Sequence, residues 1–315
     1  MPLHPQIVAL MERAAAAGVR PTHELTPEEA RAQMDEMSRE RDKDRTKVRM
    51  VADTVINGAD GDDMTMRVYW PDLVQTDLAP AIMFFHGGGH VIGSLNSHDQ
   101  VARNLCADTG YLVASVDYRM GPEHKFPAAP EDCYAATKWV AENTRQLGVD
   151  PSRIAVAGDS AGANLAAVVA MMARDAGGPD IAFQLLVYPV ADYAFDTPSY
   201  ETYAEGAGIL TAAGMHWFRE HYLNGPEDRE DWRAAPLRAK DFSNLPPALV
   251  LTAECDVLHD EGVAFAEALA AAGVAVEHRD YPGMMHGFYS FAPLVDDGRA
   301  AQIHAAEAMR KVLSA

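Results

Sequence analysis

Residues Gly158–Gly162 read Gly-Asp-Ser-Ala-Gly, a G-x-S-x-G pentapeptide that separates a predicted strand, Ile154–Ala157, from a predicted helix near residues 161–175. A nucleophile elbow requires this strand–turn–helix setting. The turn is tight, and glycines on both sides of Ser160 leave room where a side chain would clash. The serine oxygen would then lie at the end of a sheet, near the positive end of a helix. A chance match is the alternative, and the setting favours the elbow.

Strands and helices alternate along most of the chain. Eight strands are predicted, at Val51–Ile56, Met64–Tyr69, Ala81–Phe85, Leu112–Asp117, Ile154–Ala157, Phe183–Tyr188, Ala248–Ala253 and Val274–Arg279. Helices are predicted near residues 97–109, 131–146, 161–175, 259–272 and 298–313. The inner strands are continuous apolar runs, which is typical of strands covered on both faces. The pattern predicts an α/β fold, a mostly parallel sheet with helices on both faces and a ligand site at the carboxyl ends of the strands.

Two segments stand outside this alternation. Residues 190–245 contain no good strand, and Ile209–Tyr222 reads as an amphipathic helix within them. Near the start, residues 5–17 predict a short amphipathic helix, and a capping box at Thr26 begins a helix that runs to about Lys47. Because this second helix mixes charges of both signs, we expect it to present a solvated face. The insertion is expected to pack over the sheet edge, against the N-terminal helices.

The composition excludes several classes of partner. The 315 residues include 46 acidic and 26 basic ones, a formal net charge of −20. Nucleic acids and anionic membranes both need an excess of Lys and Arg, so neither is an expected partner. At 48% hydrophobic residues the chain can bury a sizeable core, so the bulk of it is not disordered.

The cysteines and the apolar runs of the sequence indicate the cellular compartment of the protein. The three cysteines, Cys106, Cys133 and Cys255, lie far apart without C-x-x-C spacing, which suits a reducing compartment. The first residues lack a basic region followed by a long apolar stretch, so we expect no signal peptide. The longest apolar run, Leu165–Ala173, is too short to span a bilayer. We therefore expect a cytoplasmic protein with no membrane partner.

A second glycine-rich stretch follows the strand Ala81–Phe85. Residues His86–Gly89 read His-Gly-Gly-Gly, and their backbone N–H groups, with that of Ala161, could hold an oxyanion. A flexible loop and a metal site at His86 and His90 are the alternatives, but the glycines between the two histidines break the helix that would align them. The chain has no G-x-G-x-x-G, no P-loop and no H-E-x-x-H motif, so we expect neither cofactor nor metal.

A serine hydrolase also needs a base and an acid that orients it. Asp256 follows the strand Ala248–Ala253, and His286 follows the last predicted strand. With Ser160 they give the chain order nucleophile, acid, base that is found on α/β-hydrolase sheets.

Other residues compete for these two roles. Glu254 and Asp260 flank the acid position, but Glu254 lies nearer the strand and Asp260 is expected to start a helix, so Asp256 ranks first. His278 lies inside a predicted strand and His259 in a predicted helix, so His286 ranks first as the base.

The chain resembles the bacterial hormone-sensitive-lipase-like esterases, family IV of the α/β-hydrolases. The resemblance covers nearly the whole chain and rests on motifs at residues 86–89, 118–129, 158–166 and 256–262 with 286–288. It implies an eight-stranded sheet, with a catalytic domain over residues 48–189 and 229–315 and a helical cap over residues 1–47 and 190–228. It also implies a homodimer through the last strand and helix.

The resemblance assigns Gly87, Gly88 and Ala161 as the oxyanion donors. This chain departs from the family pattern at His90, where a bulky aromatic residue is usual, and at Ala163, where a glycine is usual. Candidate substrate-binding residues are His90, Asp159, Tyr188, Leu210 and Trp217. For Leu210 and Trp217, packing between cap and core is an equally good interpretation.

The motifs predict a serine hydrolase that works through an acyl-enzyme intermediate, and the resemblance implies that it is an esterase that hydrolyses short-chain carboxylic esters without a cofactor. The charge of −20 favours a neutral ester over an anionic one. Two alternatives stay open: an amidase or deacetylase that uses the same triad, and a non-catalytic ligand receptor on the same fold.

Overall fold

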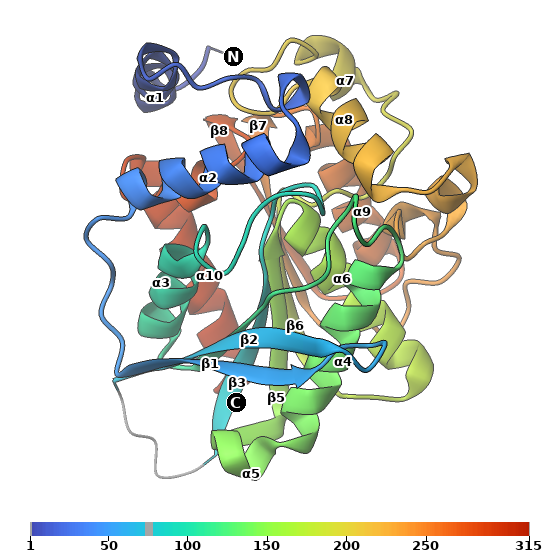
Figure 1. The fold of residues 1–315 in the computed structure, drawn as a ribbon. Coiled ribbons are helices and arrows are strands. Elements are labelled where there is room, and N and C mark those ends of the chain that lie inside the picture. Colours follow the sequence, from blue (N-terminus) through green and yellow to red (C-terminus); the bar gives the residue numbers. More distant parts are fainter. Residues whose placement is uncertain (1, 73–77, 315) are drawn as a thin grey trace.

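The computed structural model describes residues 2–72 and 78–314, and within them eight strands form one sheet (Figure 1). The strands are β1 (Met50–Asn57), β2 (Asp63–Trp70), β3 (Ala79–Phe85), β4 (Leu112–Val116), β5 (Val149–Asp159), β6 (Ile181–Val187), β7 (Ala248–Cys255) and β8 (Val276–Met285). Their order across the sheet is β1-β2-β4-β3-β5-β6-β7-β8. β2 pairs antiparallel with both of its neighbours, β1 and β4, and the other pairs among these strands are parallel. The predicted eight-stranded, mostly parallel sheet is confirmed.

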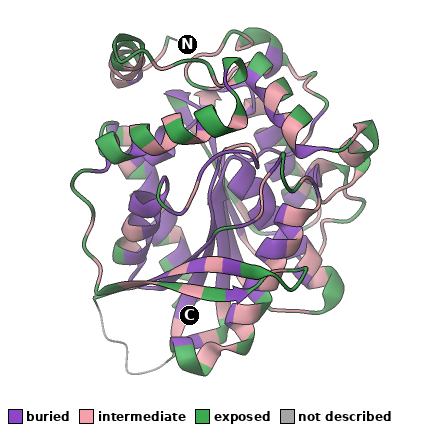
Figure 2. Cartoon of the chain, viewed as in Figure 1, coloured by how far each residue is buried: buried purple, intermediate pink, exposed green. Residues whose placement is uncertain are grey.

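The inner strands are buried because their side chains alternate between two apolar cores. In β3, Met83 and Phe85 belong to one core, whereas Ile82 and Phe84 belong to the other. All four are buried, and Figure 2 shows the same burial through the centre of the sheet. Burial of both faces is the reason that these strands read as continuous apolar runs.

Helices cover both faces of the sheet. The first core includes residues of α4 (Ala128–Glu142), α6 (Ala161–Ala176) and α9 (His259–Ala271), and the second includes residues of α3 (Asp99–Thr109) and α10 (Asp296–Leu313). The short helix α5 (Thr144–Leu147) precedes β5, and 3₁₀ turns lie at Thr22–Glu24, Pro226–Glu230, Pro236–Arg238 and Phe288–Phe291. This layering brings the loops after β3, β5, β7 and β8 to one end of the sheet.

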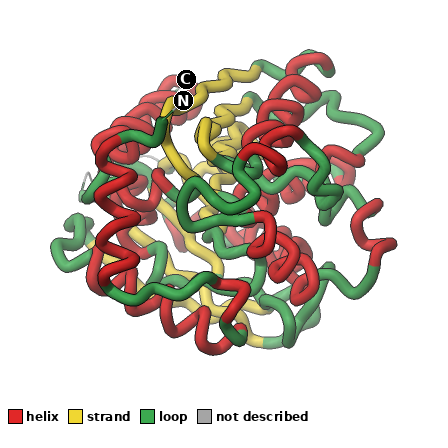
Figure 3. The backbone as a smooth tube through the Cα atoms, turned by 90° about the horizontal axis from the view of Figure 1, so that it is seen from above, coloured by secondary structure: helices red, strands yellow, loops and turns green. Residues whose placement is uncertain are grey.

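Two segments far apart in the sequence lie over that end. Figure 1 shows α1 (Pro5–Ala16) and α2 (Pro27–Arg41) beside α7 (Pro198–Thr202) and α8 (Ala212–Tyr222) above the carboxyl ends of the strands, and Figure 3 gives the view from above. The backbone ties the first of these helices to the sheet, because the His4 amide donates to the Gly283 carbonyl at 3.0 Å.

The N-terminal capping box has the predicted geometry. The Glu29 amide donates to Thr26 Oγ1 at 3.2 Å, and the Thr26 amide donates to Glu29 Oε2 at 2.9 Å. The helix itself is shorter than predicted, because α2 ends at Arg41 instead of near Lys47. After that point the chain no longer follows helical hydrogen bonding, and Thr46 is bonded to residues of α3 instead.

The last strand is longer than predicted and extends directly to the residue before His286. Tyr281, Pro282 and Gly283 signal a turn in the sequence, yet they continue β8 to Met285. β8 is an edge strand of the described sheet, and an edge tolerates a proline because the missing N–H can face outward. The strand pairing also shifts register between Ala253 and Cys255.

No helix among the described residues is both long and apolar enough to cross a bilayer.

Truncating a side chain between the sheet and its helices should destabilise the protein. Leu249 of β7 is fully buried, so we expect Leu249→Ala to lower the free energy of unfolding by about 2–5 kcal/mol through lost burial and a cavity. Urea denaturation measures the change. The control Leu294→Ala, at a residue that is 38% exposed, should cost less than about 1 kcal/mol, and equal losses for the two variants would contradict the core assignment.

Candidate active site

Ser160 is the single residue between a strand and a helix, and its backbone conformation is strained. β5 ends at Asp159, α6 begins at Ala161, and Ser160 has φ 58° and ψ −122°. A non-glycine residue in this region costs about 1–3 kcal/mol and persists only when its surroundings hold it. A Cβ on Gly162 would collide with the Phe85 carbonyl, so only glycine permits the approach of the turn to the end of β3. The predicted elbow is present.

Three side chains from separate strand ends meet at this turn. His286 Nε2 lies 2.9 Å from Ser160 Oγ, and His286 Nδ1 lies 2.6 Å from Asp256 Oδ2. The other carboxylate oxygen of Asp256 accepts the Leu258 amide at 3.0 Å. Ser160 and His286 are each 8% exposed and Asp256 only 2%, so the contacts lie in a medium where electrostatic interactions are strong. Geometrically, this is a nucleophile–base–acid series.

The competing residues have other partners. Glu254 accepts the Gly283 amide at 2.7 Å, and Asp260 accepts the Ser199 amide at 2.9 Å. His278 lies on the edge strand β8, and its Nε2 is 3.0 Å from Thr252 Oγ1 of β7. None of these contacts involves Ser160, so the structure brings together only the three residues that ranked first.

The glycine loop after β3 supplies free backbone amides, but the Gly87 assignment is wrong. The Gly87 amide donates to Asp159 Oδ1 at 3.2 Å and is therefore engaged within the protein. Among the described residues none accepts a hydrogen bond from the amide of Gly88, Gly89 or Ala161. Gly88 and Gly89 have φ of 122° and 60°, a backbone region that favours glycine. The free donors thus begin one residue later than predicted.

His86 anchors the glycine loop instead of binding a metal. Its Nδ1 donates to the Gly87 carbonyl at 2.9 Å, and Tyr118 donates its hydroxyl to the His86 carbonyl at 2.7 Å. Burial is the main reason that the pKa of His86 falls to about 3, which leaves the ring neutral at pH 7. Within the described residues no group of three or more His, Cys, Asp or Glu side chains could hold a metal ion.

A cavity of about 450 Å³ extends from the triad into the helices above the sheet. Ser160, His286, Gly88 and Gly89 contribute to its wall. Apolar side chains provide much of the remaining wall: Leu10, Met11, Ile92, Ile209, Met34, Met37, Met215, Phe218, Met285 and Phe291. A pocket of this size and lining suits a small, largely apolar molecule.

The five predicted substrate-binding residues divide into two groups. Asp159 and Leu210 line the cavity, whereas His90, Tyr188 and Trp217 are absent from its wall. Tyr188 packs against His286, with ring centroids 4.5 Å apart, and Trp217 packs against His221 at 4.3 Å. Among the five, the structure therefore supports a place on the cavity wall for Asp159 and Leu210 only.

His90 is fully buried and stacks on Tyr222 of α8, with ring centroids 4.0 Å apart. Burial is again the largest cause that lowers its pKa, here to about 3, so the ring is neutral. The His90 ring therefore packs in the interior of the protein, against α8.

One face of α2 has a role that was not predicted. The expected solvated face is present at Glu36 and other exposed residues. On another face, Ala30, Met34, Met37 and Arg41 line the cavity. They recur at a spacing of three or four residues, the pattern of one helix face, and this pattern could have revealed them. The charged residues between these four positions made the pattern difficult to recognise in the sequence.

Comparisons with known proteins identify the family. A family model described as the alpha/beta hydrolase fold matches residues 82–290. The chain belongs to that family. A carboxylesterase of Mycobacterium tuberculosis is 44% identical over 263 residues, which cover 82% of each chain. An ethyl acetate hydrolase of Pseudomonas putida is 37% identical over 321 residues, 99% of this chain and 100% of that one.

Solved structures give the same result. A hyperthermophilic esterase from the archaeon Pyrobaculum calidifontis aligns over 100% of both chains, with a TM-score of 0.95 and 42% identity. The resemblance to the hormone-sensitive-lipase-like esterases is confirmed, and this member of the family is a carboxylic ester hydrolase.

Replacing His90 by phenylalanine should leave substrate preference of the esterase unchanged. The ring stacks on Tyr222 and does not line the cavity, so His90→Phe keeps the packing. We expect kcat/KM to stay within about threefold of the parent for p-nitrophenyl acyl esters of increasing length. Leu210→Ala, which enlarges the cavity wall, should instead raise the relative rate on longer esters. A changed length optimum in His90→Phe would show that His90 does contact substrate.

Proposed function

We propose that Ser160 attacks the ester carbonyl and that His286 takes the serine proton as general base. Asp256 orients the imidazole and stabilises its charged form. The observation that carries this proposal is the unbroken contact series from Ser160 Oγ through His286 to Asp256, opening on a cavity beside free backbone amides. His286 then returns the proton to the leaving alcohol, and water hydrolyses the acyl-enzyme by the same steps in reverse order.

The amides of Gly88, Gly89 and Ala161 are the proposed oxyanion donors. Ala161 is the first residue of α6, where a helix leaves its amide without an internal partner, and the N-terminal end of the helix favours negative charge. Each donor of this kind is worth about 3–4 kcal/mol in the transition state.

The proposed substrates are neutral, short-chain carboxylic esters. The mostly apolar wall disfavours charged groups, and the net charge of −20 would repel an anionic ester. The Pseudomonas relative is named for its action on ethyl acetate. We propose that residues 1–47 and 190–228 form the cap that encloses this ester, on a catalytic domain of residues 48–189 and 229–315. The cap excludes water and so strengthens the interactions of the buried triad.

We also propose that the esterase is cytoplasmic. Its cysteines are buried as free thiols, which supports a reducing compartment.

Replacing the nucleophile should abolish hydrolysis. We expect Ser160→Ala to lower kcat/KM for p-nitrophenyl butyrate by about 10⁴-fold or more, and Asp256→Asn to lower kcat by about 10⁴-fold, both with unchanged thermal unfolding. The control Ser152→Ala, at an exposed serine of β5, should keep full activity.

A phosphonate that reacts with activated serines should label the parent enzyme at one group per chain and leave Ser160→Ala unlabelled. If Ser160→Ala retains most of the activity, the assignment fails. An absence of both labelling and hydrolysis in the parent would point to a ligand receptor.

A homodimer through β8 and α10 is the proposed assembly. β8 lies at the edge of the described sheet, and Ile303 of α10 is an apolar residue that is 41% exposed. Multi-angle light scattering should give twice the mass of the chain, and Ile303→Glu should shift the mass toward that of one chain. A single-chain mass for the unaltered protein would contradict the proposal.

A further inference from the structure

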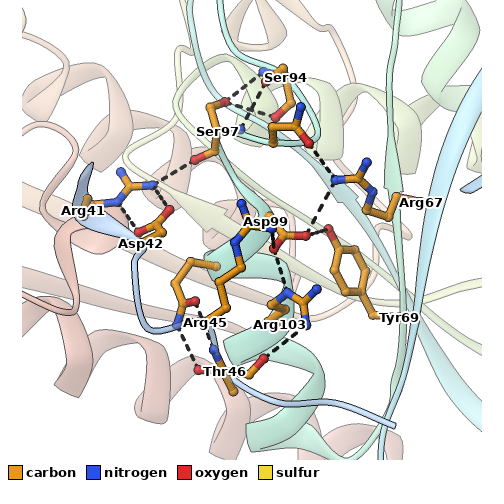
Figure 4. Close-up of polar contacts among 12 residues, drawn as sticks. Arg41, Asp42, Arg45, Thr46, Arg67, Tyr69, Ser94, Ser97, Asp99 and Arg103 are labelled. Carbon is orange, nitrogen blue, oxygen red and sulfur yellow. Dashed lines mark hydrogen bonds and ion pairs between the residues drawn. The ribbon is translucent and has the colours of Figure 1, made fainter. Parts of the chain in front are cut away.

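A series of polar contacts leads from the end of α2 to the loop with the proposed oxyanion donors. Arg41 Nη2 donates to the Ser97 carbonyl at 2.8 Å, as Figure 4 shows. Ser97 Oγ lies 2.9 Å from His98 Nδ1, and His98 Nε2 lies 3.4 Å from Asp159 Oδ1. The same Asp159 oxygen accepts the Gly87 amide at 3.2 Å. We call these five residues the α2–Gly87 series.

The side chains of His98 and Asp159 in this series are buried and face each other. The side chains of His98 and Asp159 are 3% and 6% exposed, and a carboxylate this deep needs a partner. Burial by itself would raise the pKa of Asp159, but the three nearby histidines, His98 foremost with His286 and His86, together lower it. His98 Nε2 faces this carboxylate at 3.4 Å. Neither residue belongs to the triad.

Asp159 also fixes the position of Gly87 by shape. A Cβ on Gly87 would lie 2.7 Å from Asp159 Oδ2 and 2.8 Å from the Asp159 carbonyl, closer than real Cβ atoms approach. Carboxylate and loop backbone are therefore in close contact as well as hydrogen-bonded. A displacement of the Asp159 side chain would move the backbone at Gly87, and with it the next two amides.

Helix α2 contacts the loop at two further points. Arg31 Nε donates to the Val91 carbonyl at 2.8 Å, and Ser94 Oγ donates to Asp35 Oδ1 at 2.9 Å. Together with Arg41, these contacts attach one face of α2 to both ends of the segment between Val91 and Ser97. The helix that lines the cavity is thus also joined to the backbone that follows the oxyanion donors.

A second buried carboxylate holds the far end of the loop. Asp99, the residue after His98, is 1% exposed and accepts from Tyr69 at 2.9 Å and from Arg103 at 2.6 Å (Figure 4). Arg45 lies 3.3 Å from the same carboxylate. These contacts join the start of α3 to β2 and to the chain after α2, so His98 is presented to Asp159 from a fixed backbone.

We propose that His98 is a positioning residue of the esterase: by holding Asp159 it keeps the glycine loop in place to stabilise the oxyanion. Through its hydrogen bond to the Ser97 carbonyl, Arg41 connects the end of α2 to His98 and the glycine loop. The proposal rests on the proposed function, because it concerns transition-state stabilisation at Ser160.

The proposal has a kinetic signature. Oxyanion donors act mainly on the transition state, so their displacement lowers kcat and leaves ground-state binding nearly unchanged. A residue that bound substrate directly would change KM instead, and a residue that only supported the fold would change stability without a matching loss of kcat.

The test compares His98→Phe with the parent enzyme. Phenylalanine keeps the ring that packs beside His86 and Phe84 and removes both polar contacts. We expect kcat for p-nitrophenyl butyrate to fall by about 10- to 100-fold, part of the effect of losing one donor, with KM within about threefold. Affinity for a trifluoromethyl ketone, whose serine adduct carries the oxyanion, should weaken by the same factor as kcat/KM.

Companion variants keep the test decisive. His98→Gln retains an amide donor and should recover part of the lost kcat. His221→Phe is the control, because His221 is half-buried and hydrogen-bonded but does not line the cavity, and it should keep the parent kcat. If His98→Phe does not fold, Arg41→Met carries the test, with a smaller loss of kcat expected at unchanged KM.

The outcomes separate this proposal from the proposed function. An unchanged kcat, or an unchanged affinity for the ketone, in a folded His98→Phe or Arg41→Met overturns the positioning role. A rise in KM with parent kcat also overturns it, because it assigns the residue to substrate binding. Full activity of Ser160→Ala would overturn the proposed function itself, whatever the effect at His98.

Discussion

The close approach of the Ser160 turn to the end of β3 is the constraint on which the site depends. β3 and β5 are parallel neighbours, so the loop after one and the turn after the other leave the sheet at the same edge. Gly162 permits contact with the Phe85 carbonyl that any side chain would prevent. The strained serine and the glycine loop therefore share one rigid support, and the tertiary contacts that surround Ser160 offset the cost of its backbone conformation.

Buried acids paired with histidines organise the polar part of the site. Asp256 faces His286 on the side of the nucleophile, and Asp159 faces His98 on the side of the glycine loop. Both carboxylates also accept a backbone amide, so each fixes a loop as well as a ring. These pairs are buried, where the dielectric constant is low. Separating the two side chains would leave a buried polar group without a partner, at the full free-energy cost of its desolvation. The site is in this sense built from two similar units.

Local sequence patterns predicted most of the sheet, the elbow and the three triad residues. Continuous apolar runs identified the inner strands, since burial on both faces leaves no room for polar residues. The last strand was predicted only to Arg279, whereas β8 continues through Pro282, a residue that its place at the sheet edge makes acceptable. The cavity-facing residues of α2 were not predicted, because the helix mixes charges of both signs and only its solvated face was expected.

The sequence by itself determined the fold class and the three residues proposed as nucleophile, base and acid, because those depend on the order of strands and on residues next to strand ends. Only the tertiary structure decided which glycine amides are free. The Gly87 amide is taken by Asp159, a contact across 72 positions of the chain that no local pattern encodes. It likewise decided that His90 faces Tyr222 rather than the cavity, because the direction of a side chain depends on backbone angles and on neighbours from distant segments.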